Sequence, residues 1–188
     1  MQPLRDPRPT PDLKICGITD PEQAQAIAQM GVQAIGVIGV PATPRFVEQA
    51  QRRALFQLLE QQHPQLHRVW VVADPDDAAL EEALNGAGQP SVVQLHGSES
   101  DERCQHLKQR HHWQQWWKAL RVREPDDLKQ LEHYAPHVDA LLIDAWSADQ
   151  LGGTGHRIPL DWVRETKLSV PWWLAGGVSA EWVSELLS

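Results

Sequence analysis

The sequence of 188 residues is poor in cysteine, in phenylalanine and tyrosine, and in positive charge. Two cysteines, Cys16 and Cys104, are too few for the disulfide framework of a small secreted fold, so we expect a reducing, cytoplasmic setting. The 17 Lys and Arg against 25 Asp and Glu give a formal net charge of −8, which argues against binding to nucleic acid or to an anionic membrane. No run reaches the roughly 20 apolar residues of a membrane span. The composition, 41% hydrophobic and 22% charged, is that of a globular protein.

The chain is predicted to consist of a proline-rich arm, residues 1–12, and one domain, residues 13–188. Prolines at positions 3, 7, 9 and 11 indicate an extended arm. Short apolar runs then alternate with longer amphipathic stretches. The runs span residues 13–18, 34–40, 68–73, 91–96, 116–122, 140–145 and 172–175. Continuous apolar runs separated by helices predict an α/β protein with a buried parallel sheet.

The stretches between the runs carry signals for helix starts and ends. Residues 21–30 are predicted to form a helix with Asp20 as its N-cap, Pro21 at the first helical position and Gly31 as its stop. Further helices are predicted over 47–62, after the acidic segment 74–77, and after 124–127. Seven strand–helix units fit either an open doubly wound sheet or a closed barrel, and their spacing does not decide between the two. No Gly-x-Gly-x-x-Gly follows the first run, which weakens the nucleotide-binding version of the open sheet.

Polar and reactive residues gather where the apolar runs end. Parallel strands bring their carboxyl ends to one edge, where α/β proteins place their sites. These ends carry Cys16, Gly17, Arg45, Asp74, Gln94, His96, Gly97, Arg121, Asp144, Gly176 and Gly177. A purely structural sheet would not need such a set, so we expect a functional site at this edge.

Cys16 and Asp144 are the candidates for acid–base chemistry. The thiol could be a buried small hydrophobe or a reactive group, and the carboxyl could cap a turn or donate a proton from apolar surroundings. A thiol and a carboxyl on opposite sides of a pocket would suit an isomerisation. The glycines of residues 152–155 and the pair Gly176-Gly177 could offer backbone amides to a phosphate, or could form tight turns.

The nine histidines do not form the pattern of a metal site, and no metal is expected. His111 and His112 are adjacent and cannot face one ion from one helix, while His133 and His137 flank a proline near a predicted helix end. Most of the histidines are expected at the surface. His96 is the exception because it stands at a strand end.

Seven short segments, taken in order, resemble the phosphoribosylanthranilate isomerase family of tryptophan biosynthesis. They are residues 14–19 (KICGIT), 43–47 (TPRFV), 93–97 (VQLHG), 118–122 (KALRV), 142–145 with 152–155 (LIDA and GGTG), 160–162 (LDW) and 174–178 (LAGGV). The resemblance implies a (β/α)8 TIM barrel without metal or organic cofactor. It also implies an Amadori rearrangement, an aldose–ketose isomerisation of N-(5-phosphoribosyl)anthranilate to 1-(2-carboxyphenylamino)-1-deoxyribulose 5-phosphate. The implied partner is therefore a phosphorylated small molecule.

The family's pattern implies a role for each matching residue. Asp144 is the general acid that protonates the ribose ring oxygen and opens the ring to a Schiff base. Cys16 is the general base that removes the proton from C2. Arg45 matches the residue that pairs with the anthranilate carboxylate. Gln94, His96 and Arg121 match substrate-binding positions, and Gly153, Gly155, Gly176 and Gly177 match the phosphate-binding backbone.

The resemblance departs from the family at the end of the sequence, where seven strand–helix units stand against eight. An eight-stranded barrel closes by pairing its last strand with its first, so seven units should expose two edges. We therefore expect residues 1–188 alone to be poorly soluble or nearly inactive. A non-catalytic remnant, or a phosphate-ligand binder of the same fold, is the alternative. An isomerase of histidine biosynthesis is less favoured, because those enzymes use two Asp residues and the first run here ends in Cys16. The oligomeric state is not indicated.

Overall fold

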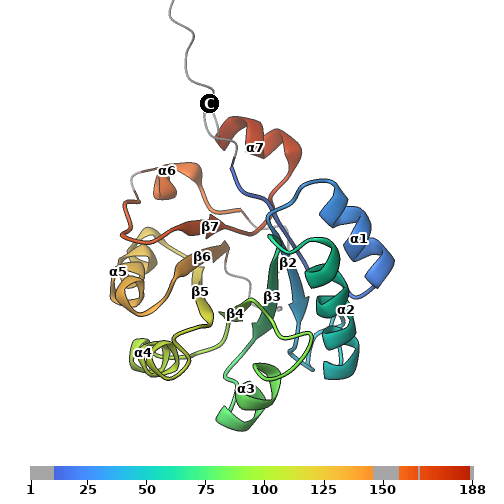
Figure 1. Ribbon diagram of the computed structural model, residues 1–188. Helices are drawn as coiled ribbons and strands as arrows, with labels where there is room; N and C mark the ends of the chain where they lie inside the picture. Colours follow the sequence, from blue (N-terminus) through green and yellow to red (C-terminus); the bar gives the residue numbers. More distant parts are fainter. Residues whose placement is uncertain (1–10, 146–156, 165, 187–188) are drawn as a thin grey trace, which may run out of the picture.

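Seven parallel strands form one curled sheet at the centre of the computed structural model, which describes residues 11–145, 157–164 and 166–186 (Figure 1). The strands are β1 (Lys14–Cys16), β2 (Ala34–Ile38), β3 (His67–Val72), β4 (Val92–Leu95), β5 (Gln115–Val122), β6 (Ala140–Ala145) and β7 (Trp172–Leu174). Each strand pairs with the next along the chain, in the order β1-β2-β3-β4-β5-β6-β7. A doubly wound sheet reverses its strand order at a switch point. The uninterrupted order and the curl therefore decide for the barrel type, and all seven predicted strands are confirmed.

Helices surround the sheet on its outer side (Figure 1). They are α1 (Pro21–Gln29), α2 (Gln49–Gln62), α3 (Asp77–Ala83), α4 (Asp101–Arg110), α5 (Gln130–Tyr134), α6 (Leu160–Val163) and α7 (Ala180–Leu186), with short 3-10 helices η1 (Pro125–Lys129) and η2 (Ala135–His137) on either side of α5. The helix expected after residues 124–127 thus begins as a 3-10 helix. None of the described helices is long and apolar enough to cross a bilayer.

Side-chain caps set the starts of three helices. Asp20 accepts a hydrogen bond from the Gln23 amide at 2.8 Å, as its predicted role as N-cap of α1 requires. The side chains of Asp76 and Ser100 cap α3 and α4 in the same way. Gly31 follows α1 with a φ of +84°, a left-handed conformation that glycine adopts without steric cost. Each start therefore follows a strand end and turns the chain back along the sheet.

The strands separate two apolar cores because successive side chains point to opposite faces. The outer core fills the space between the sheet and the helices. The inner core contains strand residues and their flanks alone: Ala34, Ile38, Val40, Val69, Val71, Val92, Trp117, Ala140 and Trp173. The indole rings of Trp117 and Trp173 stack inside the curl, with centroids 5.0 Å apart. On each strand that contributes to the inner core, these residues mark the positions whose side chains face inward.

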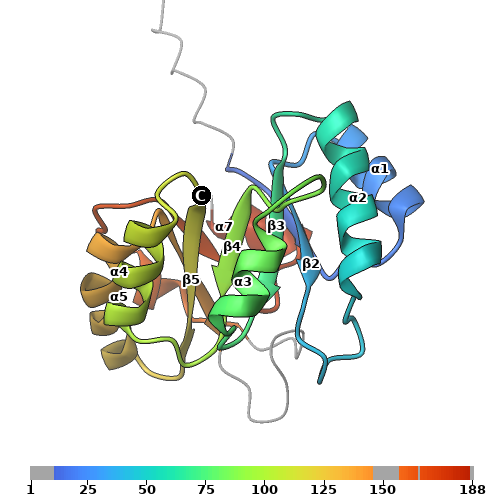
Figure 2. The same cartoon turned by 60° about the horizontal axis from the view of Figure 1, so that its bottom comes forward.

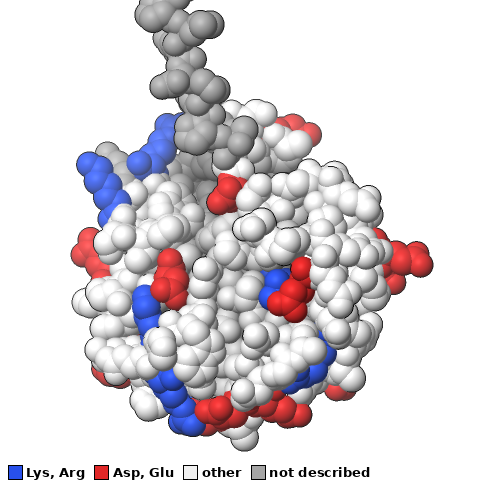
Figure 3. All heavy atoms as spheres, viewed as in Figure 1, with Lys and Arg blue, Asp and Glu red and all other residues white. Residues whose placement is uncertain are grey.

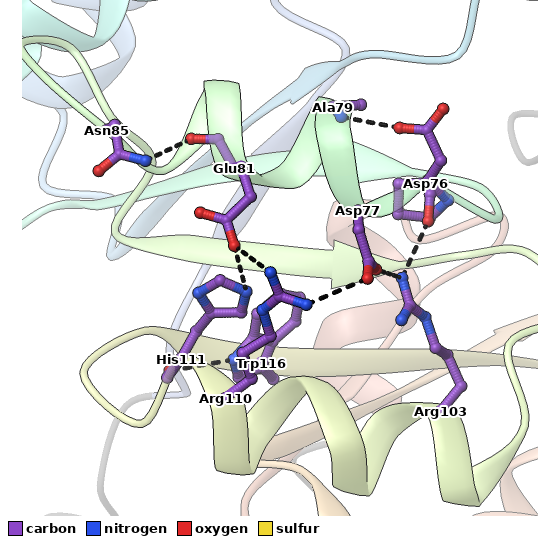
Figure 4. Close-up of polar contacts among 10 residues, drawn as sticks. Asp76, Asp77, Ala79, Glu81, Asn85, Arg103, Arg110, His111 and Trp116 are labelled. Atoms are coloured by element: carbon purple, nitrogen blue, oxygen red, sulfur yellow. Dashed lines mark hydrogen bonds and ion pairs between the residues drawn. The ribbon is translucent and has the colours of Figure 1, made fainter.

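Ion pairs join α3 to α4 on the outer surface (Figure 4). Arg103 lies 2.6 Å from Asp77, and Arg110 bridges Asp77 at 3.2 Å and Glu81 at 2.7 Å. The hydrogen bond from Arg103 and its positive charge lower the pKa of the Asp77 carboxyl. Figure 3, which faces the amino ends of the strands, shows charges of both signs side by side along its lower rim, over α3 and α4.

The expectation that His111 lies at the surface is wrong, because the residue is only 3% exposed. Its ring lies 6.0 Å from that of Trp116, and the Trp116 indole N–H donates a hydrogen bond to the His111 carbonyl oxygen at 3.4 Å. Burial lowers the pKa of His111. The histidine therefore belongs to the packing between α4 and β5, which its polar sequence neighbours did not indicate.

The two end strands leave open edges. Within the described residues, β1 pairs only with β2, and β7 pairs only with β6. Unpaired strand edges offer hydrogen-bonding groups to other chains. We predict that residues 1–188 alone associate in solution, as measured by analytical ultracentrifugation. A chain in which an added eighth strand–helix unit follows residue 188, called the extended chain below, should associate less. A monodisperse, monomeric 188-residue chain would contradict this.

Candidate active site

The alternation along β1 and β2 turns Lys14 and Cys16 toward the interior of the curl. On β2, Ala34 and Ile38 belong to the inner core, so Gly36 between them faces inward too. Lys14 pairs in register with Ala34, and Cys16 pairs with Gly36. A Cβ atom on Gly36 would lie 2.7 Å from the Cys16 Sγ, so the thiol occupies the space that a side chain there would fill.

The same alternation places four further predicted residues on the inner side. Val92, Trp117 and Ala140 belong to the inner core. Residues two or four positions further along the same strands face the same way, toward the carboxyl end. These residues are Gln94, His96, Arg121 and Asp144. Arg121 is also the register partner of Asp144 across β5 and β6. The structure thus brings the strand-end candidates to one mouth of the curl, at the lower edge of Figure 2.

Cys16 ends β1 and its thiol is exposed, whereas Cys104 on α4 is fully buried. Burial among apolar neighbours raises the pKa of the Cys104 thiol to about 12. Only the thiolate is an effective nucleophile. The two thiols therefore differ both in access and in chemistry.

We predict that iodoacetamide at pH 8 modifies Cys16 and leaves Cys104 unmodified in the folded protein. Mass spectrometry of peptides after brief labelling measures both sites. Labelling in denaturant serves as the control, because both thiols then become accessible. Equal labelling of the two cysteines in the folded protein would contradict the burial of Cys104.

A chain of three polar side chains leads from β4 to Asp144 on β6. Asp144 is 4% exposed, and its Oδ2 lies 3.3 Å from Nε2 of His96. The Gln94 side-chain amide nitrogen lies 3.2 Å from Nδ1 of His96. When the Gln94 amide N–H donates this bond, Nδ1 accepts it and a neutral imidazole carries its proton on Nε2. That N–H faces the Asp144 carboxyl as a close contact, without the alignment of a full hydrogen bond.

Arg45 lies beside Cys16 because of Gly17. The Arg45 guanidinium donates a hydrogen bond from Nη1 to the Cys16 carbonyl oxygen at 3.3 Å. A Cβ on Gly17 would lie 2.5 Å from that nitrogen and 2.8 Å from the Arg45 Cδ, and the φ of Gly17 is +86°. Glycine is therefore required after Cys16, and its lack of a side chain admits the Arg45 guanidinium next to the Cys16 backbone.

The glycine pair Gly176-Gly177 follows β7 with φ values of +92° and +58°. Arg157 donates a hydrogen bond from Nε to the Gly177 carbonyl oxygen at 2.9 Å, and another from Nη2 to Ser179 Oγ at 3.1 Å. These contacts fix the turn that precedes α7. The other predicted phosphate-binding glycines, Gly153 and Gly155, lie outside the described residues.

A family model described as N-(5'-phosphoribosyl)anthranilate isomerase matches residues 13–188. The chain belongs to this family. A relative of that name from Gloeobacter violaceus is 42% identical over 93% of this chain and 77% of its own length. Another, from Thermosynechococcus vestitus, is 44% identical over 90% of this chain and 72% of its own. The solved isomerase of Thermus thermophilus superposes with a TM-score of 0.77 at 26% identity, covering 94% of this chain and 82% of the other. Both the suspected family and the barrel type are confirmed.

Three charged residues near the site of this isomerase-family chain were not singled out from the sequence. Lys14 faces inward two residues before Cys16, a position that strand alternation alone would reveal. Lys118 and Glu99 form a buried ion pair behind the strands. A lysine in the middle of β5, between apolar neighbours on both sides, is itself a signal, because a buried charge needs a partner. The partner's identity required the structure.

Proposed function

We propose that this chain catalyses the Amadori rearrangement of N-(5'-phosphoribosyl)anthranilate, with Cys16 as the base and Asp144 as the acid. The observation that carries the assignment is the placement of an exposed thiol and a buried carboxyl, from the first and sixth strands, on the inner side of one barrel end. The rearrangement needs one proton delivered to the ring oxygen and another removed from C2. Two groups at separate positions can perform these transfers in turn.

Asp144 performs the first transfer. Its proton goes to the ribose ring oxygen, the bond between that oxygen and C1 breaks, and the nitrogen lone pair forms the C1–N double bond of a cationic Schiff base. His96 faces the carboxyl through Nε2 at 3.3 Å, and Gln94 keeps the tautomer that presents a proton there. After the transfer, the imidazole N–H lies next to the carboxylate that has formed and stabilises its charge.

Cys16 performs the second transfer. The cationic Schiff base acidifies the C2–H bond, and the thiolate removes that proton. The bonding electrons form a C1–C2 double bond and neutralise the nitrogen, which gives an enolamine. Return of a proton to C1 and loss of the C2 hydroxyl proton give the ketone. The exposed position of Cys16 leaves it accessible to a substrate that enters from the mouth of the curl.

The remaining predicted residues would hold the two anionic ends of the substrate. Arg45, next to Cys16, is placed to pair with the anthranilate carboxylate. Backbone amides at Gly176 and Gly177 would receive the phosphate, together with Gly153 and Gly155. Arg121 lies across from Asp144 and would contact the sugar. The barrel domain, residues 13–188, would therefore supply both the catalytic and the binding residues. We place the enzyme in the cytoplasm because its family belongs to a biosynthetic pathway.

A binding protein without turnover is the second candidate, favoured by the open edges at β1 and β7. The last loops of such barrels frequently complete the phosphate site. We predict that residues 1–188 alone turn the substrate over at a small fraction of the extended chain's rate, as followed by chromatography of substrate and product. Calorimetry with a reduced product analogue distinguishes the candidates. Binding by both chains without turnover by either would favour the binding protein.

A further inference from the structure

A buried ion pair lies directly behind the strand ends that form the proposed site. Lys118 on β5 stands between two inward residues, Trp117 and Ala119, and so points outward, where its Nζ lies 5.8 Å from the centre of the Tyr134 ring. Its ammonium is 2.7 Å from Oε2 of Glu99, and both side chains are 2% exposed. Burying two charges costs desolvation energy that their attraction offsets only with excellent geometry, and apolar replacements are often as stable. A contribution to stability alone is therefore a weak explanation for the presence of this buried ion pair.

The hydrogen bonds of the pair converge on Gly97, the residue after His96. Lys118 donates to the Gly97 carbonyl oxygen at 2.9 Å, and Glu99 Oε2 accepts the Gly97 amide proton at 3.0 Å. Both polar backbone groups of Gly97 are thus held by one ion pair. The His96 amide in turn donates to the Val72 carbonyl oxygen at 2.7 Å. The backbone on both sides of the imidazole is fixed before the side chain meets Asp144.

The same carboxylate also locks the end of β3. Glu99 Oε1 accepts the Asp74 amide proton at 2.7 Å, and Asp74 Oδ1 accepts the Ser98 amide proton at 2.8 Å. Asp74 has a φ of +48°, a left-handed conformation that non-glycine residues hold only where their surroundings enforce it. A Cβ on Gly97 would lie 2.5 Å from Asp74 Oδ2. The ends of β3 and β4 are therefore in close contact and are joined by hydrogen bonds through Glu99 and Asp74.

We propose that Lys118 and Glu99 are positioning residues of the isomerase site: their ion pair fixes the backbone at Gly97 and thereby holds His96 against Asp144. This inference rests on the proposed function, because it gives the His96–Asp144 contact a catalytic purpose. Neither Lys118 nor Glu99 faces the interior, so neither touches the substrate. Both act through the His96 imidazole, whose distance to Asp144 is 3.3 Å.

The test compares Lys118→Met and the double variant Lys118→Met/Glu99→Gln with a control, Arg68→Met. Arg68 is also a buried cation in an ion pair, 2.9 Å from Glu60, but it stands near the start of β3 at the opposite end of the barrel. The single variant leaves a buried carboxylate unpaired and lowers the melting temperature. The double variant removes that charge and recovers most of the melting temperature. All are made in the chain of 188 residues and in the extended chain.

Both Lys118 variants should lower kcat about tenfold or more, because small misplacements of a catalytic group are costly, while KM changes less than about threefold. They should also shift the 15N resonances of the His96 imidazole, and Arg68→Met should do neither. If the double variant recovers kcat together with its melting temperature, or if the His96 resonances do not move, the pair is merely structural and the inference is overturned. Should Lys118→Met not fold, the double variant decides. Absence of turnover in the extended chain without substitutions would refute the proposed function instead, and the His96 resonances would then decide whether the ion pair positions His96.

Discussion

Replacing Cys16 with alanine should remove nearly all turnover of N-(5'-phosphoribosyl)anthranilate in the extended chain while leaving the fold intact. The loss of a general base lowers kcat by roughly 10²–10⁴-fold. The thiol is exposed and ends a strand, so its removal costs little packing. Circular dichroism and the melting temperature should therefore match those of the unmodified protein. The steady-state rate measures the effect.

Cys104→Ala is the matched control for Cys16→Ala. The same atoms are removed, but from a fully buried position on α4 within the outer core. A buried truncation leaves a cavity and lowers stability. The control should therefore melt at a lower temperature and keep its kcat at temperatures where it remains folded. Undiminished kcat in Cys16→Ala would contradict the assignment of the base.

Asp144→Asn should lower kcat by a similar factor, roughly 10²–10⁴-fold, because the amide keeps the shape of the side chain but transfers no proton. Alanine is the poorer choice at this position. Asp144 is 4% exposed, and its truncation would leave a gap beside His96. Substrate affinity, measured by KM, should change much less than kcat, because the interaction lost is made mainly in the transition state.

The control for Asp144→Asn is Asp126→Asn on η1. Asp126 pairs with Lys129 at 2.8 Å, and both side chains are largely exposed. An exposed ion pair contributes little to stability. This variant should therefore behave like the unmodified protein in both rate and melting temperature. A kcat for Asp144→Asn within about threefold of the control would exclude Asp144 as the acid, since removal of a general acid is far more costly.

The sequence was sufficient for the strands and for the edge at which they place their polar residues. The apolar runs were continuous and bounded by glycine, proline or polar residues, which is the pattern of a sheet covered on both faces. The run 140–145 became β6, with Asp144 near its end as expected, whereas the inward direction of Asp144 follows from the structure. The spacing did not decide between an open sheet and a barrel. That distinction depends on strand order and curl, which follow from pairing between segments distant in the sequence.

The sequence was insufficient for the buried polar residues. Lys118 and Glu99 lie 19 positions apart, and only the packing of β5 behind the turn after β4 brings them to 2.7 Å. His111 is buried because Trp116 folds back onto it. Neither contact leaves a periodic signal. A charge within an apolar run indicates that a partner exists, but the fold selects the partner.

The sequence has nine tryptophans against two phenylalanines and one tyrosine, and the structure explains the places of several of them. Trp117 and Trp173 stack inside the curl, at the level of the inner core. Trp70, Trp116 and Trp182 fill the outer core. Because an indole ring is large, a few tryptophans are enough to fill the wide gaps between strands and helices. Among the tryptophans that the structure describes, Trp113 is 63% exposed and belongs to neither core.

The central claim is that the site formed by residues 13–188, in the extended chain, converts N-(5'-phosphoribosyl)anthranilate to a ketose with Cys16 as the base. The most direct measurement is 13C NMR of substrate labelled at C2, mixed with the extended chain or with its Cys16→Ala variant. The account predicts that the C2 signal moves to a ketone position with the unmodified protein and stays in place with the variant on the same timescale. Equal conversion by both proteins, or no conversion by either, would contradict it.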